Sequence, residues 1–554
     1  MTAVLSPAAR EAALAAVKGG SFDVAVVGGG VTGAGVALDA AARGLSVVLL
    51  EAGDLASGTS SRSGKTVHGG LRYLEQLNFT LVAEALHERD LMVRTLAPHL
   101  VTPEPFLFPL TKHWERPYIG AGVLLYDLMA AAGRTGGRGG VPHHRHLSRR
   151  GALREAPGLD PRVVTGALQY YDGRMDDARH TLAVARTAAA HGAVVLSHAP
   201  VVDVIRDGPR VTGVSAEDTV SGSRFDVAAS VVVNAAGVWA ADIQAMAGPP
   251  TFAVQPAKGV HLLVDQEAFD SRTGILARAE DSVIILRKWF GHWLLGTTDT
   301  AYDGDRRAPT VEREDVDYLL RNVNRYLARP LSREDVLGTF AGLRPLLAPI
   351  AKDAATTSAL SRDHTVVEEP AGMVTVVGGK YTTYRRMARD AVDAVGRAMG
   401  TGLPASPTAS LPLVGAAGWQ AVGNRVARLA AEHGVAEEHV RRMLHRYGDE
   451  LPDVLAPIHT DPALGEPIAG YLPVEFRRAV THEGALTLAD VLHRRTHLAI
   501  ERSDAGLPAA PAVAALLAPL LGWDADRQSR EVAAYRAEVE RDRAGLAAEP
   551  AGAS

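Results

Sequence analysis

A glycine-rich turn between an apolar strand and a helix constrains the fold of this chain more than any other feature. The segment FDVAVVGGG (22–30) predicts a short buried strand that runs into a glycine turn, and VTGAGVALDAAARG (31–44) predicts a helix that ends at Gly44. SVVLLE (46–51) predicts the next apolar strand. A strand, a helix and a strand within about thirty residues indicate the start of a parallel sheet.

The turn has the spacing G-x-G-x-x-G at Gly28, Gly30 and Gly33. The first glycine allows the tight turn, the second lets a pyrophosphate approach the backbone, and the third lets the helix pack on the strand. Glu51 ends the second strand, where a carboxylate can accept hydrogen bonds from ribose hydroxyls. The pattern therefore predicts a dinucleotide site, and Glu51 disfavours a cofactor with a 2′-phosphate.

Two later segments favour FAD over NAD. VVVNAAGVWA (231–240) and TVVGGKYTTYR (375–385) both read as strands that end in glycine turns, which contain Gly237 and Gly379. A chain that returns twice to its dinucleotide domain suits a long cofactor with an isoalloxazine tail. Either segment alone would be an ordinary strand-to-loop turn.

The length of 554 residues predicts two or three domains, because a single core stops growing well below this size. The net charge of −5 argues against a general polyanion binder, including a nucleic-acid-binding protein, although residues 134–154 are basic. The absence of cysteine excludes disulfides, thiolate-bound metals and a cysteine nucleophile. We expect no metal site, because the histidines in HHRH (143–146) have no partners at ligand spacing. We read no secretory signal and no membrane-spanning segment, so we expect a cytoplasmic protein that can still contact a membrane surface.

We expect an α/β fold with three parts. Residues 1–20 form an N-terminal extension, and residues 21–400 form an oxidoreductase region. That region comprises FAD-binding segments at about 21–80, 190–250 and 340–400 and segments of a β-sheet-based substrate domain at about 81–189 and 251–339. After a linker at 400–410, residues 410–545 read as an all-helical domain.

Several motifs resemble the FAD-dependent glycerol-3-phosphate dehydrogenases in the order of that family. They are residues 23–75, which end in SGKTVHGGLRYLE, and YYDGRMDDAR (170–179), AKGVH (257–261), GTTDT (296–300), AGLRPL (341–346), LSRDHTV (360–366), GGKYTTYR (378–385) and ADVLHRRTHLAIE (489–501). The resemblance implies a glutathione-reductase-type FAD domain and oxidation of sn-glycerol 3-phosphate to dihydroxyacetone phosphate. It also implies electron delivery to a membrane quinone, with peripheral contact at the inner face of the cell membrane. A homodimer is compatible with the chain.

The substrate carries a phosphate dianion, which needs convergent cations. The resemblance brings Arg344, Arg362 and Lys380 together near the flavin, with Arg72 and Tyr73 from the opening segment. Arg344 lies among apolar residues, where a charge needs a partner, and it can also polarise the hydroxyl that reacts. His261 is the candidate base, because a neutral imidazole titrates near the working pH; a lone histidine before an apolar strand is more often structural.

The remaining candidates concern the cofactor. Thr59, Ser60 and Ser61 offer hydroxyls to the pyrophosphate, although serine also favours turns and helix caps. We expect Gly69 and Gly70 to let the backbone pass close to the flavin. The further cofactor-contact candidates are His68, Gly237, Gly379, Lys380 and Thr382.

Three other functions share parts of this pattern. An oxidase that delivers electrons to oxygen would keep the same substrate. An FAD-dependent amine or amino-acid oxidase would share the fingerprint, but a carboxylate substrate needs fewer cations. A flavin-holding structural subunit would not need Arg344, Lys380 and His261. Asp176 and Asp177 could form a paired-carboxylate site, but we expect them to cap the helix that follows.

Overall fold

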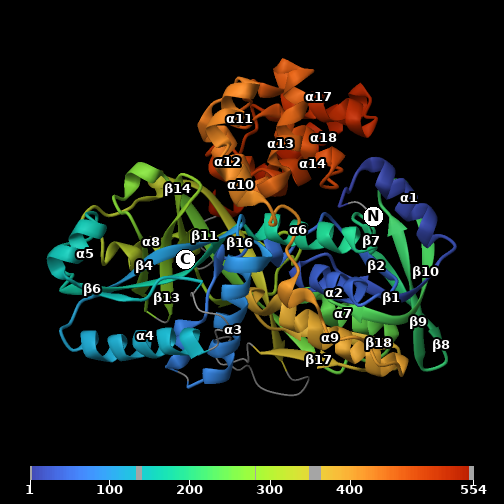
Figure 1. Ribbon diagram of the computed structural model, residues 1–554, viewed down its shortest axis with the longest axis horizontal. Coiled ribbons are helices and arrows are strands. Elements are labelled where there is room, and N and C mark those ends of the chain that lie inside the picture. The colour runs from blue at the N-terminus through green and yellow to red at the C-terminus, as the bar shows by residue number, and fades with distance from the viewer. Residues whose placement is uncertain (1–2, 76, 133–139, 281, 349–362, 548–554) are drawn as a thin grey trace, which may run out of the picture.

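The computed structural model describes residues 3–75, 77–132, 140–280, 282–348 and 363–547, which form two β-sheets and a helical domain (Figure 1). The first sheet contains the predicted nucleotide-binding unit of β1 (Ser21–Val27), α2 (Val31–Ala42) and β2 (Val47–Leu50). β1 pairs in parallel with β2 on one side and with β10 on the other. The path β17-β18-β10-β1-β2-β7 is completed by β7 (Val194–Leu196), β10 (Ser223–Asn234), β17 (His364–Val367) and β18 (Met373–Gly378).

Both faces of the first sheet are covered. α2, α6 (Asp177–Ala190) and α9 (Tyr384–Met399) pack on one face, where Val24 and Val26 join their core. Ala25 and Val27 point into a second core with α7 (Ala240–Ala247), β8 (Val201–Asp207) and β9 (Arg210–Asp218). A strand that is buried on both faces must be apolar throughout, which is why VAVV carries no alternation.

The second sheet is formed mainly by antiparallel strands. Its longest pairing joins β11 (Ala253–Val264) to β16 (Val336–Ala348), and β4 (Val101–Leu110) pairs with β6 (Gly166–Met175) along its whole length. The other members are β3 (Thr66–Val67), β5 (Arg145–Ser148), β12 (Gly274–Arg278), β13 (Val283–Trp289), β14 (His292–Gly296) and β15 (Thr300–Ala301). α8 (Arg313–Asn324) packs against this sheet through Leu319 and Val323.

The helical domain follows residue 410 and lies above the middle of the molecule in Figure 1, over α6 and β16. Its interior consists of two apolar clusters, one around α12 (Glu437–Tyr447) and one around α14 (Pro473–Thr481) and α17 (Ala510–Leu521). The last element of the described residues is α18 (Ala525–Ala547), which packs on α17. The predicted fold class, a dinucleotide-binding α/β region with a β-sheet-based domain and a helical domain, is confirmed.

Two segments lie in a different sheet from the one expected. β16 (336–348) pairs with β11 of the second sheet, although we expected an FAD-binding segment to begin at about 340. α6 packs on α2 of the first sheet, although we expected 81–189 to belong to the substrate domain. β16 belongs wholly to the second sheet, and the chain passes from β6 of the second sheet to α6 through Asp176 alone, so no long linker marks either boundary.

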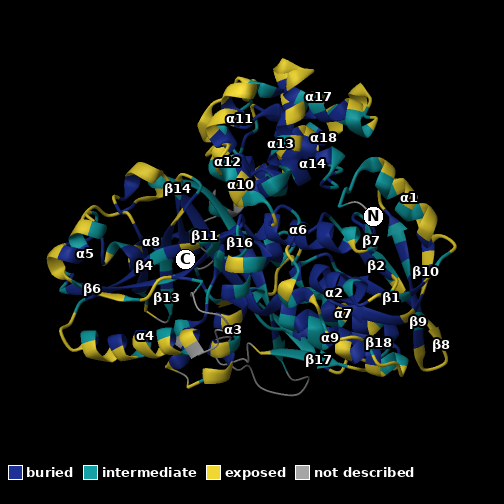
Figure 2. Cartoon of the chain, in the orientation of Figure 1, coloured by how far each residue is buried: buried dark blue, intermediate teal, exposed yellow. Residues whose placement is uncertain are grey.

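No helix within the described ranges is long and apolar enough to cross a membrane. α4 (Glu115–Ala132) nevertheless presents an exposed apolar face, visible as yellow patches along the helix in Figure 2. The exposed side chains on and beside it are Trp114, Tyr118, Leu124, Leu125 and Leu128.

Candidate active site

A cavity of about 1180 Å³ is lined by residues of both sheets and of the helical domain. It exceeds the roughly 300–1,000 Å³ of a typical small-ligand pocket, so it has room for a dinucleotide and a second small molecule. We call Gly28, Gly30, Glu51, Thr59 and Ser60 its nucleotide-binding part. We call His261, Arg287, Arg344 and Lys380 its cationic part.

Backbone contacts explain two of the three fingerprint glycines. Gly28 has φ +107°, a conformation that other residues rarely adopt. A Cβ on Gly33 would overlap the carbonyl oxygen of Gly28, so the helix could not pack this close to the turn with any side chain there. Gly33 therefore acts through helix packing, whereas Gly28 and Gly30 line the cavity.

The Glu51 carboxylate is held by the backbone. Its Oε2 accepts a hydrogen bond from the Gly29 N–H at 2.5 Å, and its Oε1 accepts one from the Gly53 N–H at 2.8 Å. Burial raises the pKa of Glu51, and these two N–H groups partly offset that effect. Each oxygen keeps a second lone pair, so the carboxylate can still accept a hydrogen bond from a ligand hydroxyl.

The three hydroxyl residues have structural partners. Ser60 Oγ accepts a hydrogen bond from the Val31 N–H at 2.9 Å, at the start of α2, and its own hydrogen is left to donate into the cavity. Thr59 Oγ1 donates to the carbonyl oxygen of Leu343 in β16 at 2.5 Å, which joins the two sheets. The Ser61 carbonyl accepts from Lys65 Nζ. Ser60 thus satisfies the first N–H of α2, whose N-cap residue is Gly30, and Thr59 and Ser61 also hold the fold together.

Gly69 and Gly70 are required by neighbouring side chains. A Cβ on Gly69 would overlap the Tyr126 hydroxyl, and one on Gly70 would lie 2.5 Å from the Tyr73 ring. Gly70 also has φ +79°. Gly70 and Tyr73 line the cavity, and Lys380 Nζ lies 3.7 Å from the centre of the Tyr73 ring, close enough for a cation–π interaction.

Two predicted residues cannot be placed. Arg362 lies outside the described residues. The backbone of Arg72 belongs to the short helix Leu71–Leu74, but its side chain lies outside the described part of the chain. Their assignment to the substrate stays a prediction.

His261 lines the cavity on β11, where it stacks on Phe340 of β16 with ring centres 5.0 Å apart. Burial, together with the charges of Arg344, Lys65 and Arg287, lowers the pKa of His261 to about 3. The imidazole is therefore neutral across the physiological range. The premise that it titrates near the working pH does not hold for this site.

Arg344 is placed by the pairing of β11 with β16. Gly259 and Gly342 face each other in the ladder, and the Arg344 guanidinium lies where a side chain on Gly259 would be. Its Nη1 donates to Asp299 Oδ1 at 3.0 Å and its Nη2 to the Thr298 carbonyl at 3.2 Å. The turn GTTD (296–299) therefore orients a predicted substrate residue.

The sequence analysis missed a buried arginine. Arg287 of β13 is 1% exposed, its Nη2 lies 2.9 Å from Glu104 Oε2, and its Nη1 donates to the Lys65 carbonyl and to Thr66 Oγ1. Burial lowers the pKa of Arg287 to about 10. The signal was present, because VIILRKW places a charge inside an apolar strand, as LRPL does for Arg344.

Comparisons with known proteins agree with this geometry. Residues 23–385 match the model of the FAD dependent oxidoreductase family, and residues 406–528 match that of the C-terminal domain of alpha-glycerophosphate oxidase. The glycerol-3-phosphate dehydrogenase 2 of Mycobacterium tuberculosis is 49% identical over 98% of this chain and 92% of its own length. The human mitochondrial glycerol-3-phosphate dehydrogenase is 34% identical over 96% of this chain and 75% of its own. This chain belongs to the FAD-dependent glycerol-3-phosphate dehydrogenase family.

A solved member of the family has the same fold. The glycerol-3-phosphate dehydrogenase of Bacillus halodurans, complexed with FAD, superimposes with a TM-score of 0.80 at 29% identity and covers 97% of this chain and 98% of its own. The chain is thus an FAD-dependent oxidoreductase. The FAD prediction, and with it the preference over NAD, is confirmed.

The residues of the cavity fit FAD. The glycine turn and the amino end of α2 suit a pyrophosphate, and Glu51 suits the adenosine ribose. Farther along, His68, Gly237, Gly379 and Thr382 line the same cavity, and their contact with the cofactor stays a prediction. Thr382 Oγ1 donates to the His68 carbonyl at 3.3 Å, which ties the loop after β18 to the opening segment.

Proposed function

We propose that the protein oxidises sn-glycerol 3-phosphate to dihydroxyacetone phosphate and passes the electrons to a membrane quinone. The observation that carries the substrate is the cationic part of the cavity, where Arg287 and Arg344 lie beside His261 and Lys380 lines the same space. A phosphate dianion suits this charge. The names of the full-length relatives support the same substrate.

When bound, FAD supplies the acceptor for the hydride that leaves C2 of the substrate. We assign phosphate binding to Lys380, Arg72 and Arg362, with Tyr73 beside Lys380 in the pocket wall. We assign to Arg344 the C2 oxygen, whose developing negative charge its guanidinium can stabilise. Asp299 and Thr298 hold that guanidinium in place.

We assign to His261 the proton of the C2 hydroxyl. With a pKa of about 3 in the free protein, its neutral imidazole is always ready to accept a proton but is a weak base. A bound phosphate dianion would offset the charges of Arg344, Lys65 and Arg287 and so raise this pKa. Substrate binding would then strengthen the base when it is needed.

The experiment is anaerobic mixing of the purified yellow protein with sn-glycerol 3-phosphate while the flavin absorbance is followed. Bleaching, and reoxidation faster with a quinone than with air, is the expected result. Fast recovery in air would instead identify an oxidase. If FAD stays bound and is not bleached, the phosphate-site assignment is wrong and an amine oxidase becomes the better reading.

We assign the membrane contact to the exposed face of α4, because Trp114 and Tyr118 are aromatic residues of the type that lie at lipid interfaces. Replacing Leu124 and Leu128 together with glutamate should reduce sedimentation with phospholipid vesicles. Val220→Glu is a matched control, since Val220 is equally exposed, at 58%, in the loop between β9 and β10. An unchanged sedimentation of the α4 variant would remove α4 from the contact.

A further inference from the structure

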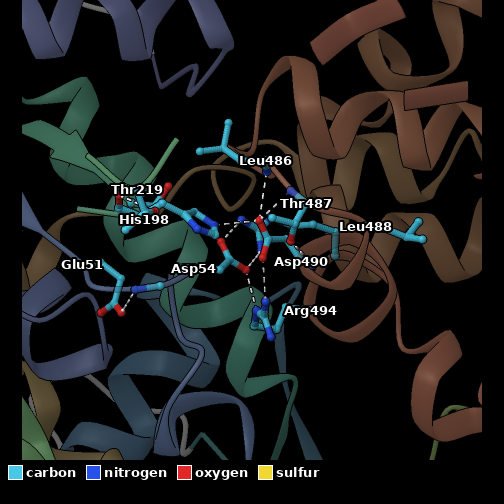
Figure 3. A network of polar contacts seen from close by, with 12 residues as sticks. Glu51, Asp54, His198, Thr219, Leu486, Thr487, Leu488, Asp490 and Arg494 are labelled. Carbon is cyan, nitrogen blue, oxygen red and sulfur yellow. Dashed lines mark hydrogen bonds and ion pairs between the residues drawn. The ribbon is translucent and has the colours of Figure 1, made fainter. Parts of the chain in front are cut away.

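The turn that follows β2 is held by the helical domain. Asp54, 2% exposed, receives two hydrogen bonds from Arg495, each at 2.7 Å, and one from Arg494 Nε at 2.5 Å. Both arginines belong to the single turn Val491–Arg495 of the helical domain. Figure 3 shows Arg494 pointing across the domain boundary toward Asp54.

The loop that follows β7 is held by the same element. His198 Nε2 lies 3.0 Å from Asp490 Oδ2, and Asp490 Oδ1 accepts from Arg494 Nη2 at 2.9 Å (Figure 3). The backbone N–H of His198 donates to the Gly53 carbonyl at 2.7 Å. Asp490 is itself fixed by the N–H groups of Leu486 and Thr487. The two loops and the helical domain therefore form one connected polar network.

This network lines the cavity where the adenosine half of a dinucleotide belongs. Asp54 and His198 contribute from the loops that follow β2 and β7, next to Glu51, and Asp490 and Arg494 contribute from the helical domain. In this fold the carboxylate at the end of the second strand faces the ribose next to the adenine. The Asp54 and Asp490 carboxylates are buried, so losing one partner would leave a charge poorly compensated and would loosen the turn.

We propose that the helical domain retains the adenosine half of FAD, with Arg494 and Asp490 as positioning residues that fix the turn between Glu51 and Asp54. The helical domain thus completes the cofactor site, in addition to packing on α6 and β16. The inference uses FAD, which the family establishes, and it depends on neither the substrate nor the electron acceptor.

The test is the rate at which the holoenzyme releases FAD after dilution, followed as the rise in free flavin fluorescence. Arg494→Ala should release FAD about tenfold faster, the effect of weakening one charge-assisted contact. Arg494→Lys should release FAD at a rate between those of the wild type and Arg494→Ala, because lysine keeps the charge but lacks the planar guanidinium. Release at the wild-type rate from Arg494→Ala would overturn the proposal.

A second variant and a matched control separate this role from general docking. Asp490→Asn should also release FAD faster, and it serves as the test if Arg494→Ala does not fold. The control is Glu450→Gln. Glu450 of the helical domain binds Arg186 of α6 at 2.7 and 2.8 Å, so it also joins the helical domain to the first-sheet region, but it does not line the cavity. We expect Glu450→Gln to lower the Tm with FAD release unchanged. If it accelerates release as much as Arg494→Ala, the network has no specific role in holding FAD.

Discussion

The nucleotide-binding part of the cavity comes from residues 28–60, whereas the cationic part collects side chains from β11, β13, β16 and the loop after β18. In the first, backbone groups and small residues make the site, with Gly33 in contact with Gly28 and Glu51 bonded to two N–H groups. In the second, ionisable side chains make the site, and burial lowers the pKa values of His261 and Arg287. We therefore expect substitutions in the nucleotide-binding part to disturb packing and FAD binding. Substitutions in the cationic part should lower activity while FAD stays bound.

The largest effect is expected from Gly33→Ala, which tests whether packing governs the nucleotide-binding part. The new methyl group would overlap the Gly28 carbonyl, so α2 must move and the stability should fall by about 3 kcal/mol. The protein should also lose its bound FAD, measured as flavin absorbance per polypeptide. Gly122→Ala is the control, because Gly122 also lies in a helix but has open space around its Cα. A variant that binds FAD normally would contradict the packing role of Gly33.

Arg344→Ala tests whether the charge of the cationic part governs activity without affecting FAD binding. We expect kcat/KM for sn-glycerol 3-phosphate to fall about 10²- to 10³-fold, as when a group that stabilises developing charge is removed, with FAD content unchanged. Arg333→Ala is the control, since Arg333 pairs with Asp317 on the surface. Loss of FAD in parallel with activity would show that the two parts of the cavity are not separable in this way.

Two histidines should respond to pH with opposite signs. Burial lowers the pKa of His261 to about 3, so the unfolded chain binds a proton below pH 6.5 that the folded chain refuses. This costs about 2 kcal/mol of stability at pH 5, and His261→Gln should recover it as a higher Tm relative to wild type at pH 5 than at pH 7.

The pKa of His198 is raised overall. Burial and the charge of Arg494 lower this pKa, but the nearby carboxylates of Asp490 and Asp54 raise it by more. Its stabilisation is complete below pH 6.5 and is lost as the pH rises through the raised pKa. His198→Gln should therefore lower the Tm at pH 6 and have little effect at pH 9. The same sign of pH dependence for both histidines would refute the contrast.

Ser60→Ala should give the smallest effect, because it removes one cap of α2 and leaves the glycine turn intact. The loss of the hydrogen bond to the Val31 N–H should cost about 1 kcal/mol of stability and weaken FAD binding a few-fold. Ser60→Thr, which keeps the hydroxyl, is the control for the acceptor, with FAD affinity measured by titration of the apoprotein. A loss as large as that of Gly33→Ala would mean that side chains govern the nucleotide-binding part as well.

The nucleotide-binding part could be predicted because its causes are local. The spacing of Gly28, Gly30 and Gly33 and the acid at Glu51 follow from a strand, a turn and a helix that are adjacent in sequence. The same local reasoning expected Asp176 and Asp177 to cap α6; Asp176 does so by accepting from the Arg179 N–H, whereas Asp177 pairs with Lys65. Local reasoning failed for Gly69, whose need for a bare backbone comes from Tyr126 of α4, in contact only after folding.

The cationic part could be predicted only in part. Arg344 and His261 were named, but the low pKa of His261 depends on burial and on Arg287, Lys65 and Arg344, and a single segment carries no trace of these neighbours. The boundary between the sheets was equally hidden, because β16 reads as a strand in either sheet and long-range pairing decides between them.

The sequence by itself determined that this chain contains a parallel sheet and binds a dinucleotide. The glycines that allow the tight turn and its approach to a pyrophosphate lie within a few residues of one another, so their spacing can be seen without the fold. The tertiary structure decided which charges meet, which histidine stays neutral, and that Arg494 of the helical domain reaches the turn after β2. The physical reason is distance: Asp54 and Arg494 lie 440 positions apart, and electrostatic interactions at a few ångströms depend on the fold that brings them together.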